Sequence, residues 1–264
     1  ALALQIKGCL NIQYVYHDDV LYVIEVNPRS SRTVPFLSKI TGVPIINLAT
    51  KISLGQTIAS LGYRGGLLDP RPFTGIKAPV FSFAKLYRLE TSLGPEMKST
   101  GEVLGMNRQL PHALYKALLA AEFSMPPAGN ILVTVADKDK KEALTLIRKL
   151  TALDFKIHAT RGTALFLEEA GFDVKRVNKI REGSPHVLDL IHAGEINLVI
   201  NTLTKGKMPH TDGFQIRRAA AEHNVPCFTS LDTALAAGKI LEELKEGDSH
   251  GVFSLQEYLA LPQK

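Results

Sequence analysis

A carboxylate, an amide and two guanidinium groups follow one another at the end of an apolar stretch near residue 25. A strand expected over residues 21–27 alternates its side chains between two faces, so Glu25 and Asn27 project from the same face. Hard cations such as Mg²⁺ take oxygen ligands and often share them with substrate phosphates. Arg29 and Arg32 suit planar, bidentate contacts with phosphate. The spacing therefore predicts a metal and phosphate site at the end of this strand.

A further oxygen ligand is expected from the segment upstream. Residues 11–16 read as the preceding strand, and residues 17–19 read as a turn that would set Gln13 opposite Glu25 across a hairpin. Taken alone, Glu and Asn at a strand end are more often surface residues or turn formers, and arginines more often cover a solvated face. The chemical prediction thus depends on the whole string of residues rather than on any one of them.

Composition limits the classes of protein that need to be considered. With 264 residues and 45% hydrophobic content, the chain can bury sizeable cores, and two domains are expected. The net charge of +5 is spread along the chain, which favours anionic small molecules over nucleic acid as partners. Cys9 and Cys227 lie far apart without a metal-binding spacing, as expected in a reducing compartment. No apolar run approaches the roughly 20 residues of a membrane span and no signal peptide is visible, so we expect a cytoplasmic protein without membrane contact.

In the first part of the chain, prolines and glycines interrupt the pattern of helices and strands at irregular intervals. Short helices are expected over residues 35–41 and 44–54, each opening near a proline and ending at a glycine. Residues 61–79 are rich in glycine and proline and read as a loop, followed by a strand over residues 80–86 and an amphipathic helix over residues 108–123. A pair of prolines, Pro126 and Pro127, then marks a domain boundary.

Beyond that boundary, strand and helix patterns alternate. The expected strands are residues 130–136, 155–159, 174–177, 196–201 and 226–229. The expected helices are residues 138–152, 163–170, 185–193 and 212–223, with a last helix that ends at Lys245. Strands joined by helical crossovers predict a five-stranded parallel sheet covered on both faces. Ligands should bind outside the carboxyl ends of its strands.

Polar residues gather at those predicted strand ends. The turn from Thr160 to Thr163 leads from a strand into a helix, where backbone amides and the helix dipole favour a phosphate. Further hydroxyl, amide and ammonium groups follow the other strands at Thr134, Lys140, Lys179 and Asn201. Each of these alone is an ordinary cap or a solvated lysine. Together they predict an anion site at one edge of the sheet.

Two long strings resemble a known family. The string from Glu25 to Phe36 resembles the metal-binding motif of the ATP-grasp ligases, and its continuation, residues 36–44, looks like the carbamoyl phosphate synthetase large subunit. Residues 93–105 are similar to a signature that this family carries shortly before the end of its ATP-grasp unit. The resemblance implies that residues 1–125 are the C-terminal part of an ATP-grasp unit. In the family, the matching positions bind the metals of ATP, Mg²⁺ or Mn²⁺, through Gln13, Glu25 and Asn27, with Arg29 and Arg32 beside the phosphates.

A second set of motifs resembles the methylglyoxal synthase-like domain that forms the allosteric domain of the same subunit. These motifs are Thr160-x-Gly162-Thr163, Val177-Asn178-Lys179, Gly183-x-Pro185-His186 and Ile200-Asn201-Thr202. The resemblance implies an allosteric domain over residues 129–264 that binds a nucleotide such as UMP or IMP. In the family, the matching positions surround the phosphate and ribose, and here they are Thr134, Lys140, Thr160, Thr163, Lys179 and Asn201.

The implied fold is α/β: the C-terminal part of an ATP-grasp domain followed by a doubly wound five-stranded parallel-sheet methylglyoxal synthase-like domain. The implied enzyme is a glutamine-hydrolysing ligase that makes carbamoyl phosphate from bicarbonate, glutamine-derived ammonia and two ATP for pyrimidine and arginine synthesis. Its implied partners are a glutaminase small subunit and the missing N-terminal part of the large subunit, and the fragment alone should be inactive. A methylglyoxal synthase-type phosphate lyase or a stand-alone nucleotide-binding module is the alternative.

The sequence departs from the family pattern at two positions. Leu203 stands where some members carry a threonine beside the nucleotide. Ala78 aligns with a glutamate of ornithine-activated members, whereas Thr229 still matches a threonine of that site. An ornithine ammonium group buried without an anionic partner is costly, so we expect control by nucleotides rather than by ornithine.

Overall fold

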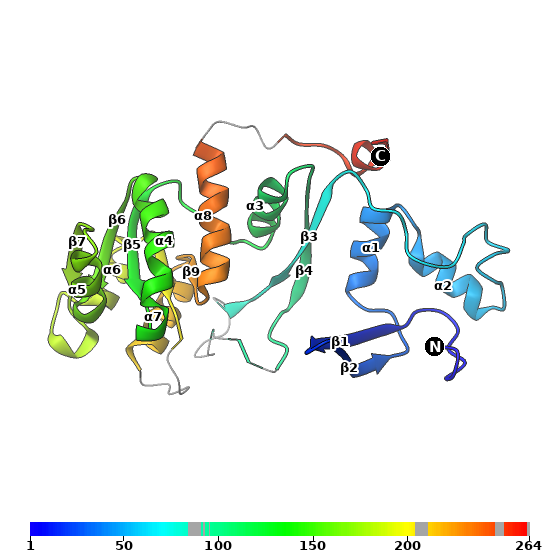
Figure 1. Cartoon of the computed structure of the whole chain (residues 1–264), viewed down its shortest axis with the longest axis horizontal. Helices are drawn as coiled ribbons and strands as arrows, with labels where there is room; N and C mark the ends of the chain where they lie inside the picture. The colour runs from blue at the N-terminus through cyan, green and yellow to red at the C-terminus, as the bar shows by residue number, and fades with distance from the viewer. Residues whose placement is uncertain (84–90, 92, 95, 204–210, 246–250, 263–264) are drawn as a thin grey trace. The chain divides into compact units, whose positions relative to one another are not determined.

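The computed structural model describes residues 1–83, 91, 93–94, 96–203, 211–245 and 251–262 (Figure 1). The chain forms two compact units, one of Ala1–Lys77 with Gly251–Lys264 and one of Ala78–His250. The domain limits expected from the motifs, 1–125 and 129–264, remain a prediction. Among the residues in the ranges above, no helix combines the length and apolar character needed to cross a membrane.

The first unit opens with an antiparallel hairpin of β1 (Asn11–His17) and β2 (Val20–Asn27). Asp18 and Asp19 form its turn with positive φ angles of 49° and 59°, a conformation that Asp tolerates better than most residues. The register pairs Gln13 with Glu25, as expected from the sequence. Between Gln13 and Tyr14 the register shifts by one residue, so Ile24 is the extra residue of a bulge.

Three helices complete this unit: α1 (Thr33–Thr41), α2 (Ile45–Ser53) and α9 (Leu255–Leu259). Gly42 ends α1 in the left-handed conformation, with its N–H donating to the carbonyl of Ser38. The sequence did not predict α9, which lies against α1. Tyr258 of α9 is only 5% exposed, and its ring contacts the rings of Phe73 and Phe253.

The strand predicted over residues 80–86 is wrong over its described part, because the observed strand ends at Val80 and residues 81–83 are not in a strand. The structure has β3 (Thr74–Val80) inside the predicted loop, paired with β4 (Gly101–Asn107), while residues 84–86 lie outside the described ranges. Gly75 and Pro79 hid this strand, because both residues normally argue against one. Glycine at position 75 allows the strand to lie close to Ile40, because a Cβ atom on Gly75 would lie 2.8 Å from Cγ2 of Ile40. The signature run over residues 93–105 is only partly described, since residue 95 falls outside those ranges.

The second unit contains the predicted parallel sheet. Its strands are β5 (Gly129–Thr134), β6 (Phe155–Thr160), β7 (Val174–Val177), β8 (Leu198–Asn201) and β9 (Cys227–Phe228). They lie in the order β7-β6-β5-β8-β9, and every pair is parallel. This confirms the predicted five-stranded sheet. The chain winds outward on both sides of β5, so the topological switch point lies between β5 and β8.

Helices cover both faces of this sheet (Figure 1). They are α4 (Lys140–Ala152), α5 (Arg161–Glu169), α6 (Val187–His192), α7 (Asp212–Glu222) and α8 (Leu231–Lys245). Strand alternation sorts the core: Ile131 and Val133 pack with residues of α4, α5 and α8, whereas Leu132 packs with residues of α6 and α7. The two-sided cover explains why these strands are apolar runs rather than alternating ones.

Helix α3 (Leu110–Ala120) joins the same core from β4. Its backbone comes so close to β4 that a Cβ atom on Gly105 would lie 2.1 Å from the carbonyl oxygen of Ala113 and 2.4 Å from the nitrogen of Ala117. Only glycine allows this approach. The helix also packs against α8, the last helix of the sheet layer.

Candidate functional sites

One polar face lies at the open end of the hairpin in the first unit. Gln13 stands opposite Glu25, and Nδ2 of Asn27 donates a 2.7 Å hydrogen bond to Oε1 of Glu25. The three side chains predicted as metal ligands therefore share one face, as the sequence indicated. Asn11 pairs with Asn27 and adds a fourth oxygen-bearing side chain to this face. Sequence reasoning missed Asn11, although the two-residue spacing from Gln13 was the signal.

The chemistry of this face fits a hard divalent cation. One carboxylate and several amide oxygens are suitable ligands for Mg²⁺, and a single carboxylate leaves positions for phosphate oxygens. Among the described residues there is no group of three or more His, Cys, Asp and Glu side chains that could hold a metal. The amide side chains of Gln13 and Asn27 would therefore have to supply the remaining protein ligands beside Glu25.

The predicted phosphate-binding arginines lie just beyond this face. Arg29 follows a tight turn in which its N–H donates to the carbonyl of Asn27, and its Nη1 donates to the carbonyl of Ser30 at 3.0 Å. Arg32 is the residue immediately before α1. Both side chains are exposed, so a phosphate group could approach them from solvent.

A second polar group lies at the carboxyl edge of the parallel sheet. The register pairs Thr134 at the end of β5 with Asn201 at the end of β8. Thr160 ends β6, and Lys179 follows β7. The structure thus brings together at one edge residues that lie far apart in the sequence, as expected for a parallel sheet.

A hydrogen-bonded chain crosses the switch point of the sheet. Nη1 of Arg217 in α7 donates to Oδ1 of Asn201 at 2.7 Å, and Nδ2 of Asn201 donates to Oγ1 of Thr134 at 2.6 Å. Arg217 and Asn201 are 7% and 4% exposed, so the chain is buried. The first turn of α7 can lie close to this hydrogen-bonded chain because residue 213 is glycine. A Cβ atom there would lie 3.2 Å from Nη1 of Arg217. Sequence reasoning missed Arg217, which no motif distinguishes from a surface arginine.

The helix that was expected to begin near Thr163 begins two residues earlier. Thr160 is extended, with φ −72° and ψ 154°, and it stands as the N-cap of α5, so Thr163 lies inside the first turn and is 5% exposed. The side chain of the N-cap residue Thr160 accepts no hydrogen bond from the first-turn amides, and the first turn contains no acidic residue. Among the described residues, no atom would lie within 4 Å of a Cβ atom on Gly162. These amides are therefore donors that an anion could use.

Lys140 begins α4 and reaches α5. Its Nζ donates to the carbonyl of Gly162 at 3.0 Å and lies 2.7 Å from Oδ1 of Asp137. The Lys140 ammonium holds the pKa of the Asp137 carboxyl below its usual value, because it stabilises the ionised form. The predicted phosphate ligand Lys140 thus already has an anionic partner.

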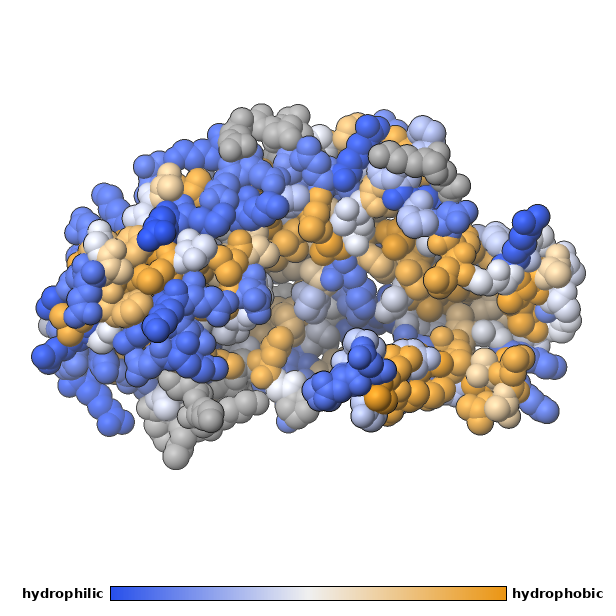
Figure 2. Space-filling view, in the orientation of Figure 1, coloured by the Kyte–Doolittle hydropathy of each residue, from blue (hydrophilic) through white to orange (hydrophobic). Residues whose placement is uncertain are grey.

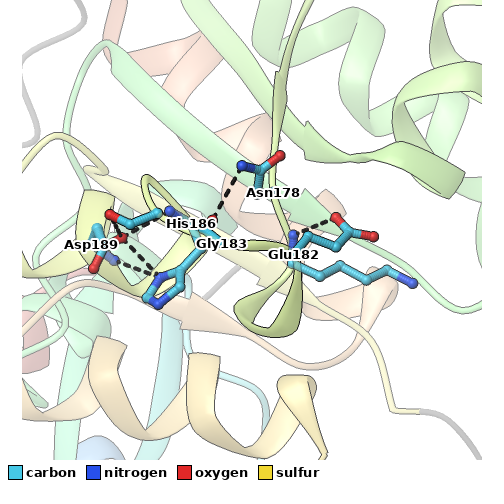
Figure 3. Close-up of polar contacts among 7 residues, drawn as sticks. Asn178, Glu182, Gly183, His186 and Asp189 are labelled. Carbon is cyan, nitrogen blue, oxygen red and sulfur yellow. Dashed lines mark hydrogen bonds and ion pairs between the residues drawn. The ribbon is translucent and has the colours of Figure 1, made fainter.

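Lys179 opens a loop that is closed by its own polar groups (Figure 3). The backbone N–H of Lys179 donates to Oε2 of Glu182 at 2.8 Å, and Nδ2 of Asn178 donates to the carbonyl of Gly183 at 3.2 Å. At the far end of the loop, Oδ2 of Asp189 accepts from the backbone of His186 at 2.9 Å. Those contacts hold the backbone of Lys179 at the end of β7 while its side chain stays exposed.

The same loop explains the perturbed carboxyl group of Asp189. The backbone N–H of His186 and the hydroxyl of Ser184 both donate to this carboxylate, and they lower its pKa. The group therefore stays ionised and caps α6. We interpret it as a structural residue of the Lys179 loop rather than as an acid or base.

Comparisons with known proteins found family models that match residues in each of the two parts of the chain. Residues 1–61 match the family model described as carbamoyl-phosphate synthase L chain, ATP binding domain, and residues 142–229 match that of the MGS-like domain. Among solved structures, the chain is similar to the methylglyoxal synthase from Elizabethkingia anophelis NUHP1. That similarity has 23% sequence identity and a TM-score of 0.36, and covers 44% of this chain and 79% of the other.

Proposed function

Because this chain belongs to the carbamoyl phosphate synthase large-subunit family, as the end of an ATP-grasp unit followed by an MGS-like domain, we propose that it takes part in carbamoyl phosphate synthesis. The proposed reaction is the cytoplasmic, ATP-dependent ligation of bicarbonate and glutamine-derived ammonia, with two ATP, for pyrimidine and arginine synthesis. A glutaminase small subunit would supply the ammonia. The observation that carries the proposal is the pairing of Gln13 with Glu25 beside Asn27, within the matched ATP-binding residues.

In this proposal, the hairpin residues act by binding and charge neutralisation. Gln13, Glu25 and Asn27 would hold Mg²⁺ or Mn²⁺, and the metal would neutralise phosphate charge when bound. Arg29 and Arg32 would orient the phosphates, because guanidinium groups match phosphate geometry bidentately. Phosphoryl transfer needs positioning and charge stabilisation rather than a protein nucleophile, so no such nucleophile is assigned.

The hairpin itself favours a larger ATP-grasp domain around it. Residues on both of its faces are apolar and exposed; Val23 is 58% exposed and Val15, on the other face, is 44% exposed. Figure 2 shows hydrophobic residues gathered over this part of the first unit. A two-stranded sheet with two exposed apolar faces needs cover on each. We propose that the preceding part of the ATP-grasp domain provides it, and that these 264 residues alone turn over negligible ATP.

In the second unit, we propose an allosteric site for the phosphate of a nucleotide such as UMP or IMP. The amides at the start of α5, the hydroxyls of Thr160 and Thr163 and the ammonium groups of Lys140 and Lys179 would bind the phosphate. Thr134, oriented by Asn201, would donate to the ligand. The location of these groups along the carboxyl edge of a parallel sheet, with Thr134 and Asn201 at its switch point, supports the assignment.

Glu25→Gln in the complete large subunit tests the metal site. The variant loses the only carboxylate of the polar face, so carbamoyl phosphate formation should be abolished, while UMP binding should be unaltered. Near-normal synthesis would show that Glu25 is not a metal ligand. Mn²⁺ affinity of the complete subunit, measured by electron paramagnetic resonance, gives a readout that does not depend on turnover.

Lys179→Ala tests the nucleotide site. A charge-assisted hydrogen bond to phosphate is worth on the order of 1.5 to 3 kcal/mol, so the affinity for UMP should fall by roughly tenfold or more. The affinity for uridine, which lacks the phosphate, should hardly change and serves as the control. Unaltered UMP binding in calorimetry would place the phosphate elsewhere.

A further inference from the structure

The ammonium group of Lys140 already interacts with several protein groups in the absence of a ligand. Its ammonium lies 2.7 Å from Oδ1 of Asp137, donates to the carbonyl of Gly162 at 3.0 Å, and lies 5.8 Å from the ring centroid of Phe166. The Lys140 side chain is 18% exposed, whereas that of Asp137 is 93% exposed. The ammonium is therefore held on the protein side of this pair, and the carboxylate lies on the solvent side.

These contacts hold Lys140 on the carbonyl side of the first turn of α5. In a helix, carbonyl oxygens point toward the C-terminus and N–H groups toward the N-terminus. The amides that would bind a phosphate thus point away from the carbonyl that Lys140 contacts. For Lys140 to bind the same phosphate, its ammonium must either move away from the Asp137 carboxylate or interact with both anions at once.

We propose that Asp137 is an affinity-setting residue of this site: its carboxylate competes with the ligand phosphate for the Lys140 ammonium. This inference rests on the proposed nucleotide function of the site. Two anions cannot both neutralise one ammonium fully, and they repel one another when they lie close together. The Asp137 side chain is 93% exposed, so water screens the carboxylate and weakens the pair, and a phosphate can displace it. The ligand consequently binds less tightly than the set of donors alone would allow.

Asp137→Asn tests the competition directly. The amide keeps the shape of the side chain but loses its charge, so Lys140 becomes available to the ligand. Exposed ion pairs are worth little, and the affinity for UMP should therefore rise by about two- to fivefold. Isothermal titration calorimetry on the 264-residue chain measures this change. A thermal melt of the same sample checks that the variant is folded.

Glu142→Gln is the matched control. Glu142 is an exposed acid in the first turn of α4, and its replacement removes the same charge from the same region. Its effect on UMP affinity should be below about twofold, because a solvent-exposed charge outside direct contact is largely screened. If Glu142→Gln strengthened binding as much as Asp137→Asn, the general field of the region would be responsible, and the proposed competition would be wrong.

A double-mutant cycle with Lys140→Met separates competition for Lys140 from direct repulsion of the phosphate. In the Lys140→Met background, Asp137→Asn should no longer strengthen UMP binding, since the ammonium under competition is gone. Equal strengthening in both backgrounds would overturn the inference. Unchanged or weaker UMP binding by Asp137→Asn, with normal binding by the wild type, would overturn this inference alone. Absence of UMP and IMP binding by the wild type would overturn the proposed nucleotide site as well.

Discussion

The guanidinium of Arg217 fixes which way round the amide of Asn201 lies. Arg217 can only donate, so the atom that it contacts at 2.7 Å must be the Asn201 oxygen. The Asn201 nitrogen then faces Thr134 and donates to its hydroxyl oxygen. The hydroxyl accepts in this bond, so its own hydrogen is not used there and can be donated to a ligand. The buried arginine thereby sets the polarity of a group at the proposed nucleotide site.

Asn201→Asp reverses that polarity. The carboxylate can still accept from Arg217, but its second oxygen would accept from Thr134 rather than donate to it. Thr134 would then no longer offer its hydrogen to the ligand, and a negative charge would lie near the proposed phosphate. We expect the affinity for UMP to fall by roughly tenfold or more, since a hydrogen bond to a charged group is worth about 1.5–3 kcal/mol. Calorimetry measures the loss, and a melting curve close to that of the wild type would exclude unfolding as its cause.

Gly162→Ala separates binding from stability. No atom of the part of the chain that the structure describes lies within 4 Å of a Cβ atom at this position, and alanine is a better helix former than glycine by about 0.5–1 kcal/mol. The melting temperature should stay the same or rise slightly. UMP affinity should nevertheless fall, because the methyl group would lie where the phosphate approaches the amides. Unaltered UMP affinity would mean that the phosphate does not approach this part of α5.

In contrast to Gly162→Ala, Gly105→Ala should cause a large loss of stability. The new Cβ atom would overlap backbone atoms of Ala113 and Ala117, which are fully buried and cannot move independently of α3. We expect a loss of about 3 kcal/mol or more in the free energy of unfolding, measured with urea. Gly238→Ala in α8 is the control. There the only described atom within 4 Å of the new one is a side-chain carbon of Leu146 at 3.4 Å, and stability should change by less than about 1 kcal/mol.

His158 should make the second unit sensitive to acid. This residue of β6 is 3% exposed, and burial lowers its pKa below the usual 6.5 because the charged form is disfavoured inside the protein. Nearby Lys175 lowers this pKa further, while a hydrogen bond to the Lys156 carbonyl and the charge of Glu195 act against the shift.

The sign of the pH effect follows from that shift. The unfolded chain binds a proton near pH 6.5 and the folded chain binds it only at lower pH, so stability is lost as the pH falls below 6.5. The urea midpoint should be lower at pH 5.5 than at pH 7.5. His158→Leu should reduce this difference. An equal difference in both proteins would assign the acid sensitivity to other groups.

Much of the second unit could be predicted from the sequence, because apolar periodicity and helix boundaries are local properties. The parallel sheet follows from the alternation of strands and helices. The expectation that ligands bind at its carboxyl edge follows from the fold class alone. The pairing of Gln13 with Glu25 was equally accessible, since a short turn determines the register of a hairpin. Thus the sequence by itself determined the architecture of this unit and predicted where both candidate sites would lie.

Local signals failed where distant segments determine the conformation. The strand Thr74–Val80 was hidden by Gly75, whose missing side chain makes room for Ile40. Helix α9 is a five-residue segment, too short to show a period, and its buried Tyr258 packs on residues far away in the sequence.

Tertiary structure alone decided the polarity of the proposed nucleotide site. Arg217 is 16 residues from Asn201, which is 67 residues from Thr134, so no local pattern connects them. The parallel pairing of β5 with β8 places Thr134 beside Asn201, and the close approach of α7 at Gly213 adds the guanidinium. A sequence shows which side chains can donate or accept hydrogen bonds. Which of these groups meet, and which hydrogen therefore remains for a ligand, depends on packing between segments that only the folded chain brings together.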